Sequence, residues 1–229
     1  MYPTAVDELV AGKFIDDRAI VWSLPVRIVV APAAPADWSR ADRSRVPASW
    51  IDAMTRGSAG DAIAALGWPT VEPFLPRTVA ELRDKLAGLG VMLADGKSPR
   101  LLYFFVADGQ CFAFEGFPPA EGPFDLRPRP PNVATMQRLH DGWFEFFTGD
   151  LGPMPEEEWP VIGPAPSDGS TLIGIASKGS ALAGFEPEAP GLPARVLWPA
   201  DWQVETPEDL FETVDEWIAL ALESSDSQT

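Results

Sequence analysis

The sequence predicts a fold of the α+β class, in which helices are combined with strands that turn back on one another. Two aromatic runs, LLYFFVA and QCFAFE, flank Asp108 and Gly109, which form the preferred two-residue turn of a hairpin. Residues 206–222 carry one apolar stripe at helical spacing. Apolar residues make up 46% of the 229, so the chain can bury a sizeable core.

The first half of the chain predicts several short elements. A clear helix is expected over 78–89, where Thr78 and Glu81 would form a capping box and apolar residues recur at helical spacing. The hairpin is expected over 101–115. The other expected elements are a strand at 19–30, a polar and Pro-rich connector at 32–47, and two short helices within 46–67.

The second half begins with six prolines within 117–132, which predict a linker or a long crossing loop. In the closing helix, Thr206 is the expected cap and Pro207 the first helical residue. Glu212, Asp215 and Glu216 are expected outside its apolar stripe. The remaining expected elements are a short helix at 133–139 and strands at 143–148, 171–177, 181–186 and 194–198.

The acidic charge is concentrated in one part of the chain. The protein has 17 basic and 34 acidic side chains, a net charge of −17. Residues 1–138 carry a net charge of −1, whereas residues 139–229 have 2 basic and 18 acidic side chains, a net charge of −16. Such a surface repels nucleic acid and anionic membrane and favours a basic partner. The alternative is a solvated surface that keeps the protein soluble.

Residues suited to catalysis or metal binding are scarce. One histidine, His140, and one cysteine, Cys111, exclude a His/Cys zinc site within the chain, and no EF-hand spacing is present. Gly96, Lys97 and Ser98 lack the spacing and the following helix of a P-loop. We therefore expect no catalytic, cofactor or metal site; a Ca²⁺ or Mg²⁺ site made of carboxylates stays an open alternative, since the chain has 34 acidic residues. Without a signal peptide, a disulfide pair or a long apolar run, a cytoplasmic protein is expected.

The loop at 149–160 is the predicted partner-binding surface. It places four acids beside two tryptophans, which offers charge for steering and aromatic area for anchoring. The predicted binding residues are Trp143, Asp150, Glu156, Glu157, Glu158 and Trp159. The alternative is a solvated acidic turn, with tryptophans that fill the core of a loop-rich fold.

The order of features over residues 130–222 resembles the Smi1/Knr4 (SUKH) superfamily. The stretches that carry the likeness are MQRLHDGWFEFFTGDLGPMPEEEWPVIG, TLIGIASKGSALAGFEPE, ARVLWPADWQVE and TPEDLFETVDEWIAL, and VPASWIDAMTRGSAG is similar to the family's opening helix. The resemblance implies a mixed or mainly antiparallel sheet packed against helices. It also implies a single domain over 46–224 with a Pro-rich internal loop, after an N-terminal extension over 1–45. The alternative is two domains, 1–116 and 133–224.

In function, the resemblance implies a non-catalytic binding protein, most often a bacterial immunity protein that neutralises a cognate toxin. Nuclease toxins are frequent targets in this family, and they must present positive charge to their substrate. Two alternatives stay open. One is an adaptor or chaperone in a secretion or regulatory assembly, and the other is a hydrolase that uses carboxylates alone.

Overall fold

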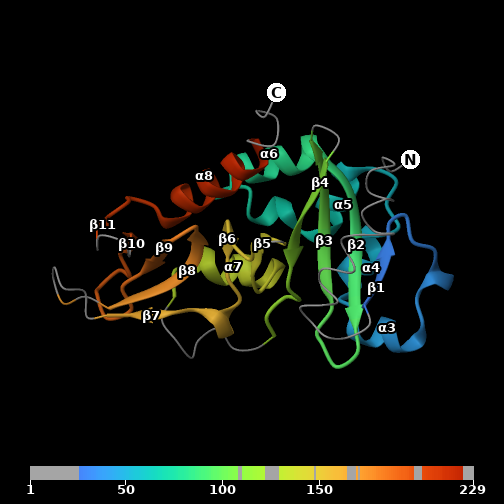
Figure 1. Ribbon diagram of the computed structural model, residues 1–229, viewed down its shortest axis with the longest axis horizontal. Coiled ribbons are helices and arrows are strands. Elements are labelled where there is room, and N and C mark those ends of the chain that lie inside the picture. Colours follow the sequence, from blue (N-terminus) through green and yellow to red (C-terminus); the bar gives the residue numbers. More distant parts are fainter. Residues whose placement is uncertain are drawn as a thin grey trace.

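The computed structural model describes residues 26–107, 110–121, 129–146, 148–163, 169, 171–198 and 203–223. These residues form two antiparallel sheets with helices packed against them, which confirms the predicted α+β class (Figure 1). The first sheet has the order β1-β2-β3-β4-β5, and the second has the order β11-β10-β9-β8-β6, with β7 also paired to β8.

The elements are short apart from the central strands and the closing helix. The strands are β1 (Val26–Val30), β2 (Leu86–Ala94), β3 (Arg100–Ala107), β4 (Gln110–Gly116), β5 (Trp143–Glu145), β6 (Gly152–Pro153), β7 (Val161–Ile162), β8 (Leu172–Lys178), β9 (Ala181–Phe185), β10 (Ala194–Trp198) and β11 (Gln203–Glu205). The α-helices are α3 (Arg40–Arg45), α4 (Ala48–Ala53), α5 (Ala59–Leu66), α6 (Pro76–Lys85), α7 (Pro131–Leu139) and α8 (Leu210–Glu223). The 3₁₀ helices are η1 (Pro35–Asp37), η2 (Trp68–Thr70) and η3 (Glu156–Glu158).

The predicted hairpin is confirmed as β3 and β4. Ala107 pairs with Gln110, so two residues lie between the strands, as a two-residue turn requires. The turn residues, Asp108 and Gly109, lie outside the described residues, as do 19–25 of the first expected strand. The described part of that strand, β1, pairs with β2 along its whole length and is therefore part of the first sheet.

The helix predicted over 78–89 is wrong at both of its ends. It begins at Pro76 and ends at Lys85, and the chain then continues directly into β2. Nearly every residue of β2 is buried, because the strand lies inside the sheet with β1 on one side and β3 on the other. A strand that is covered on both faces has a continuous run of apolar residues. Such a run also contains leucines at helical spacing, so the start of β2 resembles the end of a helix.

The connector predicted over 32–47 is also wrong, because it contains η1 and α3. Ser39 caps α3: its hydroxyl accepts from the backbone N of Asp42, and the Asp42 carboxylate accepts from the backbone N of Ser39. The sequence carries this capping box in the positions Ser39 and Asp42, with Asp in place of the usual Glu. The two helices expected within 46–67 are confirmed as α4 and α5.

The closing helix α8 lies beside α6 along one edge of the molecule (Figure 1). It begins at Leu210, later than predicted, and its cap is Asp209, whose carboxylate accepts from the backbone N of Phe211 at 2.8 Å. Thr206 follows directly on β11, which extends to Glu205 in its pairing with β10. The apolar stripe is confirmed, with buried residues Leu210, Phe211, Val214, Trp217, Ile218 and Leu222.

Asp215 was expected outside this stripe, but it is 4% exposed and caps the neighbouring helix. Its two carboxylate oxygens accept from the backbone N of Arg77 at 3.0 Å and from the backbone N of Thr78 at 2.8 Å. The predicted capping box of α6 is therefore wrong. Glu81 instead forms an ion pair with Lys85 at 3.1 Å.

Replacing Asp215 by alanine is expected to lower the free energy of unfolding by about 2 kcal/mol, because two amides at the start of α6 lose a charged acceptor in a buried place. Asp215→Asn keeps one acceptor oxygen and should lose about half as much. Urea denaturation of the three proteins measures this. Equal stability of Asp215→Ala and the wild type would show that the carboxylate does not support α6.

The hairpin between β5 and β6 connects the two sheets. The backbone N of Glu145 donates to the carbonyl of Asp150 at 2.7 Å. A Cβ at Gly152 would lie 2.1 Å from the carbonyl oxygen of Trp143, so only glycine allows this close approach.

One core cluster includes buried residues of both sheets and of α8, among them Tyr103, Phe185 and Val214. The division into domains stays a prediction, since residues 122–128 lie outside the described residues.

Among the described residues, no helix has both the length and the apolar character that crossing a membrane requires.

Candidate functional site

Trp143, a predicted binding residue, lies in the core. It is fully buried on β5, where it stacks on Phe114 with ring centroids 4.5 Å apart. Trp68 and Tyr103 form edge-to-face contacts with Trp143, with ring centroids 5.0 Å and 5.6 Å from its own. Because Trp68 belongs to η2, the Trp143 ring lies between the first sheet and that 3₁₀ helix. Its prediction as a partner anchor is therefore wrong, because no partner can reach this ring in the folded protein.

Asp150 supports a turn of the second sheet. Its carboxylate accepts from the backbone N of Gly179, in the turn between β8 and β9, and its backbone forms a bridge with Glu145. The side chain is half-buried. These contacts give Asp150 a structural role in the free protein.

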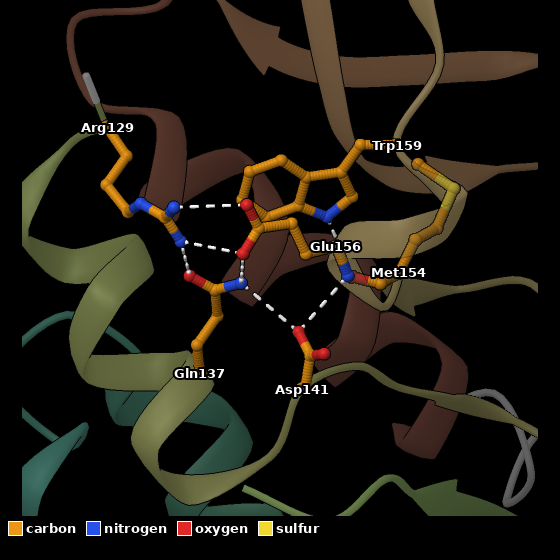
Figure 2. Close-up of polar contacts among 6 residues, drawn as sticks. All are labelled: Arg129, Gln137, Asp141, Met154, Glu156 and Trp159. Atoms are coloured by element: carbon orange, nitrogen blue, oxygen red, sulfur yellow. Dashed lines mark hydrogen bonds and ion pairs between the residues drawn. The ribbon is translucent and has the colours of Figure 1, made fainter. Parts of the chain in front are cut away.

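Glu156, at the start of η3, is held by a polar network (Figure 2). The guanidinium of Arg129 donates to both of its carboxylate oxygens, at 3.0 Å and 3.1 Å. Arg129 also donates to the side-chain oxygen of Gln137, on α7. The Arg129 side chain is 6% exposed and that of Glu156 is 30% exposed, so the pair lies at the boundary between core and surface.

Further bonds complete this network. The side-chain amide of Gln137 donates to Glu156 and to Asp141, both at 3.1 Å, and Asp141 accepts from the backbone N of Glu156 at 3.1 Å. Trp159 donates its indole N–H to the carbonyl of Met154 at 2.9 Å, and its ring lies 5.7 Å from the Arg129 guanidinium. The Trp159 side chain is half-buried, and Figure 2 shows its ring beside the Glu156 carboxylate.

Glu157 and Glu158, the next two residues of η3, are exposed. We call this pair the acidic tip. Within the described part of the chain, neither forms an ion pair. Val161, at the start of β7, is 67% exposed. Of the two large apolar residues that are exposed among the described residues, it is the more exposed. Of the six predicted binding residues, the acidic tip alone is both charged and open to a partner.

The network that supports the acidic tip was not predicted from the sequence. Arg129 stands 27 positions before Glu156, and Gln137 stands 19 positions before it. Arg129 lies in the Pro-rich stretch, and Gln137 is one polar residue on a short helix. Neither position carries a local pattern that would indicate its partner.

His140 is buried at the end of α7, and both of its ring nitrogens are bonded. Nδ1 faces the carbonyl oxygen of Phe117 at 2.8 Å, so it must carry the proton and donate. Nε2 therefore accepts from the hydroxyl of Tyr103 at 2.6 Å, and that hydroxyl accepts from the indole N–H of Trp68 at 2.9 Å. Burial lowers the pKa of His140 to about 4, although the bond to Phe117 opposes the shift.

Cys111 lies on β4, and burial raises the pKa of its thiol to about 11. The thiol is therefore protonated at neutral pH and is a poor nucleophile. Because both ring nitrogens of His140 are bonded to other groups, the pairing of Cys111 with His140 as nucleophile and base does not occur in this arrangement.

Cavities and acid clusters add little that could hold a small ligand. In the residues that the structure describes, no group of three or more His, Cys, Asp or Glu side chains is placed to hold a metal ion. A pocket of about 180 Å³ lies between the α4–α5 loop and the start of β2, and one of about 230 Å³ lies beside Arg27, Asp42 and Arg45. The cavity next to the network is only about 10 Å³.

Comparisons with known protein families, with curated proteins and with solved structures give no match to this chain.

Proposed function

We propose that this protein is a non-catalytic binding domain that uses its acidic tip to bind a basic protein. The carboxylates of Glu157 and Glu158, which are exposed and form no ion pair among the described residues, carry this proposal. The network beneath them fixes their backbone, because Glu156 is tied to Arg129, Gln137 and Asp141 at its side chain or its amide. A preorganised charged surface loses less conformational entropy on binding than a loose one.

The long-range electrostatics support the same partner class. The net charge of residues 139–229 is −16, so an approaching basic protein experiences an attractive field before it makes contact. The acidic tip and the exposed side chain of Val161 then offer a charged and an apolar contact close together in the chain. Charge mainly accelerates encounter, whereas burial of apolar area adds affinity.

Within this class, we propose the role of a bacterial immunity protein that neutralises a toxin. The likeness to the Smi1/Knr4 superfamily supports it, and so does the acidic half, which matches the positive surface that a nuclease toxin needs for its substrate. Such a protein would bind one partner tightly and turn over no substrate.

Neutralising the acidic tip is expected to slow association. The double variant Glu157→Gln/Glu158→Gln should associate about tenfold more slowly with the basic partner at low salt, and by a much smaller factor at high salt. Stopped-flow kinetics with the product of the neighbouring gene, or with a basic protein captured from the native cell and then purified, measures the effect.

The matched control is Glu188→Gln/Glu212→Gln, which removes the same charge at two other exposed positions without ion pairs in the described chain. The control should slow association far less than the acidic-tip variant. If both variants behave alike at every salt concentration, the total charge matters and the acidic tip is not the docking surface. Capture of many unrelated partners would favour the adaptor role, and turnover of a substrate would favour the hydrolase.

A further inference from the structure

The groups around the side chain of Arg129 form a receptor for the two terminal nitrogens of a guanidinium ion, while the buried Nε has no hydrogen-bond partner among the described residues. Two nitrogens of Arg129 face the two carboxylate oxygens of Glu156, which is the bidentate geometry that guanidinium and carboxylate share. A third contact is the side-chain oxygen of Gln137. The ring of Trp159 lies 5.7 Å from the guanidinium carbon, inside the roughly 6 Å range of a cation–π contact.

These receptor groups are held in place by bonds in which Arg129 takes no part. Gln137 donates to Glu156, Glu156 donates its backbone N–H to Asp141, and Trp159 donates to Met154. Figure 2 shows the bonds from Gln137 to Glu156 and from Glu156 to Asp141 next to the guanidinium contacts. The receptor should therefore keep its shape when the guanidinium leaves.

The guanidinium itself comes from irregular backbone. Arg129 lies just before α7 and belongs to no helix or strand, whereas the receptor groups lie on α7, in η3 and directly after η3. Withdrawal of its side chain breaks no backbone bond of a helix or a sheet. It removes the guanidinium that both oxygens of the Glu156 carboxylate bind, beside the two charges of the acidic tip.

We propose that Glu156, Gln137 and Trp159 form an arginine-binding site, which Arg129 occupies in the free protein and an arginine of the basic partner occupies in the complex. The claim that a partner's arginine enters the site rests on the proposed function, but the guanidinium site itself does not. Exchange of one guanidinium for another conserves the hydrogen bonds and the ion pair, so the acidic tip needs only to bring the second arginine close. Lysine lacks the planar fork and should not substitute.

The site is tested first without any protein partner, by filling it from solution. Methylguanidinium should raise the thermal midpoint of Arg129→Ala by about 3–6 °C at ten times its Kd, and methylammonium at equal ionic strength should not. The double variant Arg129→Ala/Glu156→Gln should show no rise, and the wild type should rise by about a third as much as Arg129→Ala or less, because Arg129 competes for the site. If Arg129→Ala does not fold, Arg129→Gln replaces it. If methylguanidinium raises the thermal midpoint of Arg129→Ala no more than that of the double variant, the proposed site is overturned.

Exchange is tested with arginine and lysine nonapeptides, which carry equal charge. If Arg129 occupies the site nine-tenths of the time, its removal should lower the Kd for the arginine peptide about tenfold and leave that for the lysine peptide unchanged. Equal or weaker binding of the arginine peptide by Arg129→Ala would show that Arg129 is a structural tie, which overturns the exchange. Absence of any native basic partner would refute the proposed function alone, because both probes are independent of it.

Discussion

Replacing Trp143 by alanine is expected to lower the free energy of unfolding by about 4 kcal/mol, as for other large side chains removed from a core. The ring is fully buried, stacks on Phe114 and meets the edges of Trp68 and Tyr103. Its removal would leave a cavity among aromatic rings that cannot collapse onto one another, because they stand on a sheet and on a short turn. Urea denaturation at neutral pH measures the loss.

The matched control is Trp159→Phe, at the half-buried tryptophan of the same part of the chain. It removes one hydrogen bond to Met154 and little packing, so the expected loss is about 1 kcal/mol. A loss below about 1 kcal/mol for Trp143→Ala would contradict its place in the core and would make the ring a possible partner anchor again.

The second large effect is expected from His140 in acid. Burial lowers the pKa of the folded protein's imidazole to about 4, below the ordinary 6.5 of an unfolded chain. The unfolded state therefore binds the proton more readily, and stability rises with pH across this window. The contribution should be complete above pH 6.5 and lost as the pH falls toward 4, a change of about 3 kcal/mol.

The measurement is a series of urea denaturation curves between these pH values for the wild type and His140→Gln. The carboxylates of Asp42 and Glu72, whose pKa values are lowered, titrate in both proteins, so the difference between the two curves isolates His140. The variant should be less stable at neutral pH, and the difference should shrink in acid. Two parallel curves would mean that His140 takes up its proton equally well in the folded state.

The ring of His140 is enclosed on all sides, and both of its nitrogens are bonded. Nearby tryptophans, Trp50 and Trp68, exclude water from the ring, and Tyr103 and Phe117 occupy its nitrogens. A Cβ at Gly116 would lie 2.6 Å from the ring, which shows how closely the backbone of β4 approaches it. His140 connects the first sheet to the end of α7, and through Asp141 to the base of the acidic tip.

Elements specified by local chemistry could be predicted. The β3–β4 hairpin depends on a turn of two adjacent residues and on the aromatic runs beside it. Helix α8 depends on the spacing of apolar residues within one segment of the chain. The end of α6 was wrong for a tertiary reason. The leucines at 82, 86 and 89 fit a helix, but pairing with β3 makes the last two part of a strand.

The sequence by itself determined the composition of the candidate site: the concentration of acid after residue 138, the adjacent glutamates at 156–158 and the tryptophans around them. Tertiary structure decided the role of each residue. The tertiary structure buries Trp143 and pairs Glu156 with an arginine 27 positions away. It leaves Glu157 and Glu158 exposed to solvent. Turns and helix stripes follow from the dihedral preferences of neighbouring residues, whereas burial and ion pairing depend on which distant segments pack together.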